Sequence, residues 1–339
     1  MTSTGSAGAT ALRDEYDVLL LDLDGTVYQG PHAIPGAREA LEAGTGRQFY
    51  VTNNASRTPS EVAQHLRDLG FAAADDDVVT SSQSAARLLA ERLEPGAAVL
   101  VVGTEALAGE IEQAGLTPVR RFEDAPVAVV QGHNPDTGWR ILAEATLAIR
   151  SGAVWVASNV DTTLPTERGL VLGNGSMVAA LRTATGQAPL VAGKPAAPLM
   201  EDALRRSRAD RPLVVGDRLD TDIAGANAVG VDSLLVLTGV STPADLLRAD
   251  ASHRPTYVAH SLDALNAPSA GARIAPRAGW RVEFESGDLV VHADGAVSTD
   301  RAGAFLSVLA AAWRHPEFVR VRAADDTART ATAVLSGDI

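Results

Sequence analysis

Acidic side chains near the start of the chain and again after residue 210 are the groups best suited to chemistry. Asp22 and Asp24 stand in the run Asp-Leu-Asp-Gly-Thr-Val over residues 22–27, and Asp217 follows a second apolar run. Two nearby carboxylates suit a hard divalent cation with oxygen ligands. They also suit a division of labour between a nucleophile and a general acid/base. Any single Asp-x-Asp could instead be the polar end of a strand before a turn, without a role in chemistry. This alternative explains the whole run over residues 22–27 poorly.

Lys194 is the only lysine of the chain, although Lys and Arg together number 29. Lysine is normally among the commonest residues, so arginine has replaced it almost everywhere. A position that keeps a compact ammonium group indicates chemistry that a planar guanidinium cannot copy. Chance survival of one surface lysine is the alternative reading.

Apolar runs directly before these polar residues are typical of strands buried on both faces of a parallel sheet. Helical segments lie between them, which gives a β-α-β alternation. In such sheets the site lies at the carboxyl ends of the strands, so Asp22, Thr52 and Asp217 are predicted to converge. A turn at Asn53-Asn54 and a helix N-cap at Asp217 are structural alternatives. The strands are predicted at residues 18–21, 48–52, 213–216 and 233–237.

A helix is predicted to begin after Thr58. Thr58 can cap it, Pro59 suits the first turn and Glu61 can complete a capping box. Apolar residues then recur at helical spacing until Gly70.

The middle of the chain repeats the alternation separately, and we interpret it as a second α/β module inserted into the first. Its strands are predicted at 98–102, 127–130 and 154–157, and its helices at 105–114, 139–150 and 177–185. The glycines at 173 and 175 predict a tight turn before the last of these helices.

The end of the chain has a different character. Residues 267–279 are rich in Ala, Pro, Gly and Arg and predict a linker. A hairpin is predicted at 280–285 and 288–292 around Ser286-Gly287, then a helix at 302–314, a short strand at 319–321 and a loose end. Because this is a thin core, the unit is expected to pack on the main body or on another subunit. The predicted division is 14–83 core, 84–187 inserted module, 188–266 core, 267–279 linker and 280–339 C-terminal appendage.

Composition narrows the classes of function. The net charge of −13 argues against a broad surface for nucleic acid or anionic membrane, which needs clustered Lys and Arg. Without cysteine, disulfides and thiol chemistry are excluded. No apolar run approaches the ~18 residues of a membrane span. Residues 1–13 lack the pattern of a secretory signal, so we expect a disordered lead-in to a cytoplasmic protein.

Four motifs together resemble the haloacid dehalogenase (HAD) superfamily, in its NagD-like class IIA branch. Residues 22–26 resemble the first motif, Thr-Asn-Asn-Ala-Ser at 52–56 the second, Gly-Lys-Pro at 193–195 the third and 216–223 the fourth. Their order and the long insertion after the second motif also match, over roughly residues 15 to 265. The resemblance implies a Rossmann-like doubly wound parallel sheet, an inserted α/β cap domain and, here, a small α+β appendage.

The resemblance also implies roles in phosphoryl transfer. Asp22 would be the nucleophile that forms an aspartyl-phosphate, and Asp24 the general acid/base. Mg²⁺ would be held by the Asp22 carboxylate, the Asp24 backbone carbonyl and Asp217. Lys194 would offset charge on the nucleophile and the transferring group. The remaining implied site residues are Thr52, Asn53 and Asn54 for the phosphate and Asp222 as an outer-shell acid that orients a metal-bound water or Lys194.

Two residues of the fourth motif leave alternatives open. Asp220 lies near Asp222 and could take its place, although the family pattern favours Asp222. Arg218 is expected to be a solvated or structural arginine, with an approach to the phosphate as the alternative.

The cap is expected to select the substrate. The loop at 133–139, which follows a predicted cap strand, resembles the family's specificity loop, so His133 and Asn134 are candidate substrate contacts. His133 departs from the apolar or aromatic residue expected there, and a polar loop with a buried Trp139 is the alternative.

The implied function is hydrolysis of a small phosphate monoester. Glycerol 3-phosphate is the favoured substrate, from the resemblance of the cap loop and appendage to one branch of the family. Phosphoglycolate, pyridoxal phosphate, nucleotides and sugar phosphates are alternatives. A homo-oligomer through the cap or the appendage is also possible. A non-catalytic ligand sensor or scaffold is the candidate from another class, and the intact acid and lysine set argues against it.

Overall fold

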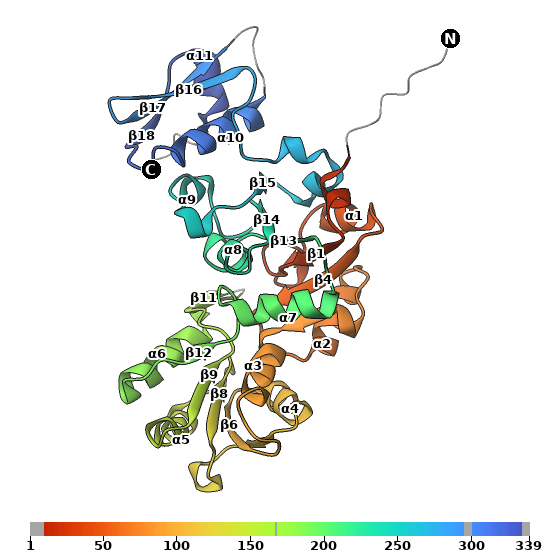
Figure 1. The fold of residues 1–339 in the computed structure, drawn as a ribbon, viewed down its shortest axis with the longest axis vertical. Coiled ribbons are helices and arrows are strands. Elements are labelled where there is room, and N and C mark those ends of the chain that lie inside the picture. Colours follow the sequence, from red (N-terminus) through yellow and green to blue (C-terminus); the bar gives the residue numbers. More distant parts are fainter. Residues whose placement is uncertain (1–9, 167, 295–299, 334–339) are drawn as a thin grey trace.

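The computed structural model describes residues 10–166, 168–294 and 300–333, and its centre is a six-stranded parallel sheet (Figure 1). The strand order is β15-β14-β13-β1-β4-β5. The sheet confirms the predicted doubly wound α/β class. Its strands are β1 (Val18–Leu21), β4 (Arg47–Thr52), β5 (Val78–Thr80), β13 (Pro212–Gly216), β14 (Asp232–Val236) and β15 (Tyr257–Ala259).

Helices cover both faces of this sheet because successive side chains of β1 point to opposite sides. Leu19 and Leu21 pack toward α1 (Ala37–Glu42) and α2 (Pro59–Asp68). Val18 and Leu20 pack on the other face, with apolar side chains of α7 (Ala197–Ser207) and α8 (Ala224–Ala228).

The predicted start of α2 is confirmed. The Glu61 N–H donates to Thr58 Oγ1 at 3.2 Å, and the Thr58 N–H donates to Glu61 Oε2 at 2.7 Å. This reciprocal capping box satisfies two backbone donors at the helix end. It fixes where the chain turns after Thr52, and therefore the shape of the loop at 53–57.

A second parallel sheet, in the order β12-β9-β8-β6-β7, forms the inserted module in the lower half of Figure 1. Helices α3 and α4 cover one face, and α5 and α6 the other. Helix α3 begins at Ser81 and strand β12 ends at Val191, so these two elements reach beyond the predicted limits of 84 and 187. The domain division remains our interpretation. The elements are α3 (Ser81–Ala90), β6 (Ala98–Val102), α4 (Glu105–Gln113), β7 (Thr117–Val119), β8 (Ala128–Gln131), α5 (Trp139–Arg150), β9 (Val154–Ala157), β10 (Thr163–Thr166), β11 (Gly169–Leu172), α6 (Asn174–Thr185) and β12 (Leu190–Val191).

The start of α6 corrects one prediction. The helix begins at Asn174, three residues before the predicted start, so the glycine-rich run forms its first turn and not a preceding loop. Asn174 Nδ2 donates to the Asn159 carbonyl at 2.7 Å. A Cβ at Gly175 would lie 2.1 Å from the Val160 carbonyl oxygen. Glycine is therefore required because the helix end and the loop after β9 lie in contact.

The appendage is a three-stranded sheet with two helices. The predicted hairpin and helix are confirmed as β16 (Trp280–Glu285), β17 (Asp288–Ala293) and α10 (Arg301–Ala312), and β18 (Arg320–Ala323) pairs parallel to β17. The predicted loose end is wrong over 326–331, which form α11 (Asp326–Ala331) with Asp325 as its N-cap. Residues 334–339 lie outside the described residues.

The appendage shares one hydrophobic core with the main body, as expected for a unit too thin to stand alone. Leu309 of α10 and Leu289 of β17 pack in the same cluster as Leu235 of β14 and Val258 of β15. The short helix α9 (Pro243–Leu247) adds Leu246 to this cluster. Trp313 also donates its indole N–H to the Leu246 carbonyl at 3.0 Å.

A variant of this shared core is expected to destabilise the whole chain. Leu309→Ala should lower the free energy of unfolding by about 2–5 kcal/mol, because the side chain is fully buried and would leave a cavity. Urea unfolding followed by fluorescence and by circular dichroism should give coincident transitions. Separate melting of the appendage before the core would contradict a shared core.

The N-terminal segment corrects another prediction. Residues 1–9 of the predicted disordered lead-in lie outside the described residues. Leu12, however, is fully buried in the core, and Arg13 is buried with its Nη1 3.4 Å from the Leu41 carbonyl. Both belong to the folded body because a short 3-10 helix, Leu12–Glu15, places Leu12 in the core cluster, and the Leu12 N–H donates to the Ala267 carbonyl at 2.8 Å.

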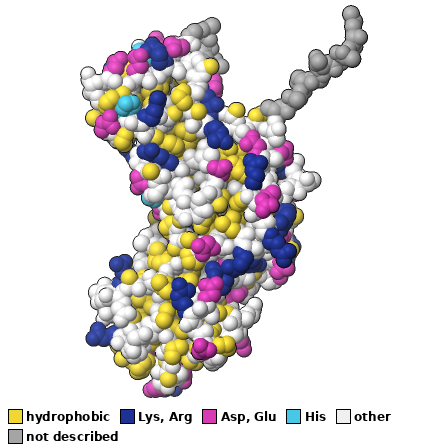
Figure 2. Space-filling model, in the orientation of Figure 1, with side chains coloured by type: hydrophobic (Ala, Val, Ile, Leu, Met, Phe, Trp, Pro, Cys, Tyr) yellow, Lys and Arg dark blue, Asp and Glu magenta, His cyan; other side chains and the backbone are white. Residues whose placement is uncertain are grey.

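The visible face of the molecule carries acidic and basic side chains interspersed with one another (Figure 2). Within residues 10–333, apart from the two undescribed gaps, no helix combines the length and apolar character that membrane crossing requires.

Candidate active site at the carboxyl edge of the central sheet

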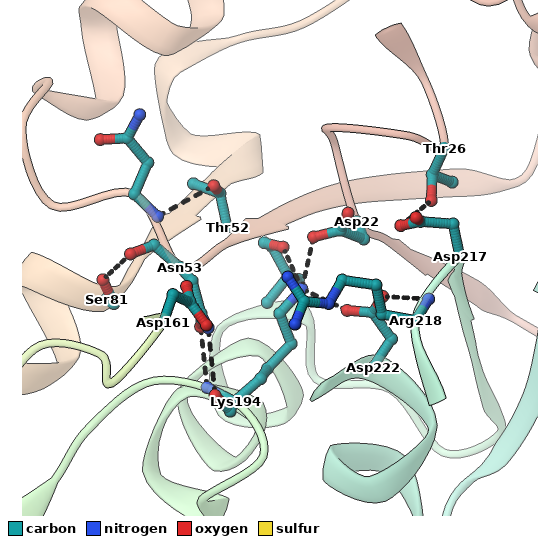
Figure 3. Close-up of polar contacts among 12 residues, drawn as sticks. Asp22, Thr26, Thr52, Asn53, Ser81, Asp161, Lys194, Asp217, Arg218 and Asp222 are labelled. Carbon is teal, nitrogen blue, oxygen red and sulfur yellow. Dashed lines mark hydrogen bonds and ion pairs between the residues drawn. The ribbon is translucent and has the colours of Figure 1, made fainter. Parts of the chain in front are cut away.

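Lys194 is buried at the end of the central sheet and is surrounded by oxygen atoms. Its side chain is 2% exposed, and Nζ lies 2.5 Å from Asp22 Oδ1, 2.7 Å from Asp222 Oδ1 and 3.0 Å from the Val51 carbonyl. An ammonium group has three donors, and these three oxygens match them (Figure 3). The surface alternative for this lysine is therefore wrong.

Asp217 and Asp222 complete the acidic group from the segment after β13. Asp217 is fully buried and accepts the Val240 N–H at 2.7 Å, with Thr26 Oγ1 3.5 Å from its other oxygen. Asp222 lies in a π-helical turn, Leu219–Ile223, whose N-cap position is Arg218, so Asp217 is not the N-cap residue. Asp222 also accepts the Arg218 N–H at 3.1 Å.

Glycines leave the space that these carboxylates occupy. A Cβ at Gly25 or Gly239 would lie within 2.5 Å of Asp217 Oδ2, and a Cβ at Gly216 would lie 2.3 Å from Asp222 Cβ. The backbone at Gly25 also has φ +88°, a conformation that residues with a side chain rarely adopt. The close approach of backbone and carboxylates therefore requires glycine at these turns.

Burial shapes the electrostatics of this group. Burial, reinforced by repulsion from Asp222, raises the pKa of Asp217 to about 7. Burial and the same repulsion also raise the pKa of Asp22 well above its ordinary value, against the opposing effect of Lys194. Burial lowers the pKa of Lys194, but the Asp22 and Asp222 carboxylates together outweigh it and raise the pKa, so Lys194 remains an ammonium. Three acids face one cation, and a further positive charge would relieve the repulsion.

The donor set fits a divalent cation. One carboxylate oxygen from each of Asp22, Asp217 and Asp222 lies within 4.8 Å of the others. Hard cations prefer such oxygen ligands. Asp220 is outside this group because its carboxylate pairs with Arg218 at 2.8 Å and is 62% exposed. The geometry thus separates the two acids that the sequence left open.

Asp24 lies on the loop that begins at Asp22, and Thr52 is the last residue of the neighbouring strand β4. Asp24 as a residue is exposed, yet partial burial of its carboxyl raises its pKa, offset by a hydrogen bond from the Gly30 backbone. Thr52 ends β4, and its Oγ1 accepts the Asn54 N–H at 3.1 Å. No acceptor within the described residues takes the Thr52 hydroxyl proton, so it can be donated to an anionic ligand.

Asn53 and Asn54 differ in what their side chains can still do. Asn53 uses its amide on Lys194: Oδ1 accepts the Lys194 N–H at 2.8 Å, and Nδ2 donates to the Lys194 carbonyl at 3.0 Å and to Asp161 Oδ2 at 3.2 Å. Since both amide hydrogens are engaged, a contact of Asn53 with phosphate would come from its backbone N–H. Asn54 Oδ1 accepts from Ser56, which stabilises the turn.

The cap loop places Gly132, the residue before His133, against the core loop and gives Asn134 an internal role. A Cβ at the neighbouring Gly132 would lie 3.2 Å from Ala55 of the core loop. Asn134 donates to the Gly103 carbonyl at 3.1 Å and accepts the Asp136 N–H at 2.9 Å, which fixes the loop. Burial lowers the pKa of His133, so it is neutral near pH 7. The alternative of a buried Trp139 is wrong, since that residue is 82% exposed.

Residues that the sequence reasoning did not assign also meet here (Figure 3). The Asn53 carbonyl accepts from Ser81 Oγ at 2.6 Å and from Asn159 Nδ2 at 2.7 Å, and Asp161 faces the Asn53 amide. The signal that could have found Asn159 and Asp161 is the one used for Asp22. Both lie in the polar segment after a buried strand, here β9, two and four residues beyond its end at Ala157.

Comparisons with known proteins agree with this architecture. A family model described as haloacid dehalogenase-like hydrolase matches residues 19–117, and one described as HAD-hydrolase-like matches residues 191–265. The chain is 53% identical to a D-glycerol 3-phosphate phosphatase from Mycobacterium tuberculosis over 332 residues, which cover 95% of this chain and 94% of the relative. It is 38% identical to an acid sugar phosphatase from Staphylococcus haemolyticus over 71% of this chain and 92% of that protein.

Solved structures give the same result. A crystal structure of the glycerol phosphate phosphatase from M. tuberculosis in complex with magnesium has a TM-score of 0.93 at 54% identity and covers 96% of this chain and 99% of its own. A p-nitrophenyl phosphatase from Archaeoglobus fulgidus has a TM-score of 0.68 at 31% identity, over 74% of this chain and 98% of its own. The chain belongs to the haloacid dehalogenase-like hydrolases, which confirms the resemblance of its motifs.

Proposed function

We propose that this chain is a Mg²⁺-dependent phosphatase that hydrolyses glycerol 3-phosphate through an aspartyl-phosphate on Asp22. The observation that carries the proposal is the buried contact of Lys194 with Asp22 and Asp222, 2.5 and 2.7 Å away. It joins the first, third and fourth motifs around one point. A sensor or scaffold would not need this costly burial of charge.

The proposed reaction has two steps that share one acid/base. An Asp22 carboxylate oxygen attacks phosphorus, the bond from phosphorus to the glycerol oxygen breaks, and Asp24 donates a proton to that oxygen. Water then attacks phosphorus, Asp24 takes its proton, and the aspartyl bond breaks to release phosphate and restore Asp22. Lys194 and Thr52 stabilise the phosphoryl oxygens by charge and hydrogen bonding. The raised pKa of Asp24 favours the protonated form needed first.

Mg²⁺ would be held by Asp22, Asp217 and the Asp24 backbone carbonyl, with Asp222 beside them. When bound it supplies positive charge that offsets the phosphate dianion. Relatives support this proposal, since the glycerol phosphate phosphatase from M. tuberculosis was crystallised in complex with magnesium. The three clustered carboxylates of this chain support it independently.

The choice of substrate rests on the extent of the similarity. The match to the mycobacterial D-glycerol 3-phosphate phosphatase spans 95% of the chain and therefore includes most of the appendage. The match to the acid sugar phosphatase spans 71%. His133, neutral and half-buried, is the proposed cap contact for a glycerol hydroxyl.

A substrate panel tests the proposal. Phosphate release should be measured from glycerol 3-phosphate, phosphoglycolate, pyridoxal phosphate, a nucleoside monophosphate and a sugar phosphate, each with Mg²⁺ and with EDTA. The highest kcat/KM is expected for glycerol 3-phosphate, with activity lost in EDTA. A higher kcat/KM for another ester would reject the substrate, and full activity in EDTA would reject the metal.

Stability should respond to Mg²⁺ more strongly at high pH. The folded pKa of Asp217, about 7 without metal, exceeds the ordinary value of 3.8. Its protonation therefore stabilises the fold below pH 4, and this contribution is lost as pH rises toward 7. Since Mg²⁺ needs ionised ligands, the Tm increase on replacing EDTA with Mg²⁺ should be larger at pH 8 than at pH 5.5. Equal increases at both pH values would contradict this prediction.

Two finer expectations are part of the proposal. We expect a cytoplasmic enzyme and a homo-oligomer formed through the cap or the appendage. Exposed apolar residues favour the cap: Leu170 and Leu172 of β11 are 72% and 62% exposed. Strand β11 pairs antiparallel with β10 to form a hairpin. Light scattering of the chain and of the Leu170→Ser, Leu172→Ser variant tests this expectation, and an unchanged subunit number would exclude the β10–β11 hairpin as the interface.

A further inference from the structure

Asp161 belongs to the cap, yet its carboxylate meets the core at Asn53. Asn53 Nδ2 lies 3.2 Å from Asp161 Oδ2 and 3.5 Å from Oδ1. The same amide holds both the N–H and the carbonyl of Lys194. The Asn53 side chain thus joins Asp161 of the cap to the backbone of the buried Lys194 (Figure 3).

The cap holds Asp161 rigidly on its own side. The Asp161 N–H donates to Asn159 Oδ1 at 3.2 Å, and the Asp161 carbonyl accepts the Gly175 N–H at 2.8 Å from the first turn of α6. A Cβ at Gly173 would lie 2.2 Å from that same carbonyl oxygen. The backbone of Asp161 is therefore held against the loop and the start of α6, and the hydrogen bond to Asn53 orients the carboxylate.

The core side of the contact is equally tight. A Cβ at Gly193 would lie 2.6 Å from Asn53 Oδ1. Lys194 follows directly, and its Nζ lies 2.5 Å from Asp22. A displaced Asn53 amide would therefore move the backbone that sets the position of the ammonium group. Small displacements of such a group reduce turnover strongly.

We propose that Asp161 is a positioning residue of the cap that fixes the Asn53 amide and, through it, Lys194. The inference rests on the proposed phosphatase function. Burial raises the pKa of Asp161, so an acid here costs stability. A neutral side chain would avoid that cost, and the hydrogen bond to Asn53 explains why an acceptor-only group is present.

Kinetics of two Asp161 variants test the proposal. With p-nitrophenyl phosphate and saturating Mg²⁺, Asp161→Ala is expected to lower kcat by about 10–100-fold with little change in KM, since Lys194 acts mainly in the transition state. Asp161→Asn should retain more activity, because its Oδ1 can still accept from Asn53. Asp124→Ala, at an exposed acid of the cap, is the matched control and should behave like the wild type.

A double-mutant cycle separates positioning from a general effect on the fold. If Asp161 acts through Asn53, adding Asp161→Ala to Asn53→Ala should lower kcat no further. If Asp161→Ala lowers kcat by the same factor in the wild-type and Asn53→Ala backgrounds, the proposal is overturned. A rise in KM at constant kcat in Asp161→Ala would also overturn it. A wild-type chain that cleaves p-nitrophenyl phosphate but not glycerol 3-phosphate would reject only the proposed substrate, because Asp161 is assessed with the former.

Discussion

Asp22→Asn is expected to slow phosphate release from glycerol 3-phosphate by at least about 10⁴-fold, the scale of loss seen when a nucleophile is removed from a group that acts as a unit. An amide oxygen is a far weaker nucleophile than a carboxylate. The shape of the side chain is nearly unchanged, so its contact with Lys194 can persist. The variant therefore tests covalent catalysis with little disturbance of the site.

The fold should survive this change, and this makes the result interpretable. The pKa of Asp22 is raised by burial and by repulsion from Asp222. A neutral amide removes that repulsion, so the Tm in EDTA should not fall. Asp220→Asn is the matched control because Asp220 pairs with Arg218 outside the buried group. Undiminished turnover by the Asp22 variant would refute the nucleophile assignment.

A covalent label gives a second measurement. Acid quenching of the wild-type chain during turnover of ³²P-labelled substrate should leave label on the protein, and Asp22→Asn should carry none. Label on the variant would place the phosphoryl group on another residue. Label on neither chain, with normal turnover by the wild type, would favour direct attack by water.

The positions of the core site residues followed from short-range patterns. Buried strands in a parallel sheet are continuous apolar runs, and the first polar residue after each run lies at the carboxyl edge. The pattern predicts Asp22, Thr52 and Asp217 at one edge of the sheet, and the structure places them at the ends of the adjacent parallel strands β1, β4 and β13. Strand ends and helix starts can be predicted in this way because they depend on residues that are close in sequence, as in the capping box at Thr58.

Contacts between distant segments could not be predicted in the same way. Asn53 was expected to face phosphate, but its amide is used by Lys194 and by Asp161, both more than a hundred residues later in the chain. The exposure of Trp139 and the burial of Leu12 likewise depend on which surfaces pack together. A buried Trp139 was the alternative interpretation of the 133–139 loop, and the hydrophobicity of one side chain does not determine which surface will cover it.

Lys194→Arg is expected to lower kcat by about 10²–10³-fold, although it keeps the positive charge. The pocket is built for a compact group: three oxygens lie within 3.0 Å of Nζ, and the side chain is 2% exposed. A planar guanidinium places its donors differently and needs more space. Gly225 packs nearby, since a Cβ there would lie 3.5 Å from Lys194 Cγ.

Stability should distinguish charge from shape at this position. In EDTA, Lys194→Arg is expected to lower the free energy of unfolding by about 1–3 kcal/mol, because the larger side chain overpacks the pocket. Lys194→Met removes the ammonium group that pairs with Asp22 and Asp222. It is expected to lower the free energy of unfolding by about 3–5 kcal/mol. Arg140→Lys, at an exposed arginine of the cap, is the control for the exchange itself. Full activity of Lys194→Arg would mean that the site requires only a positive charge, and the single lysine of an arginine-rich chain would then need another explanation.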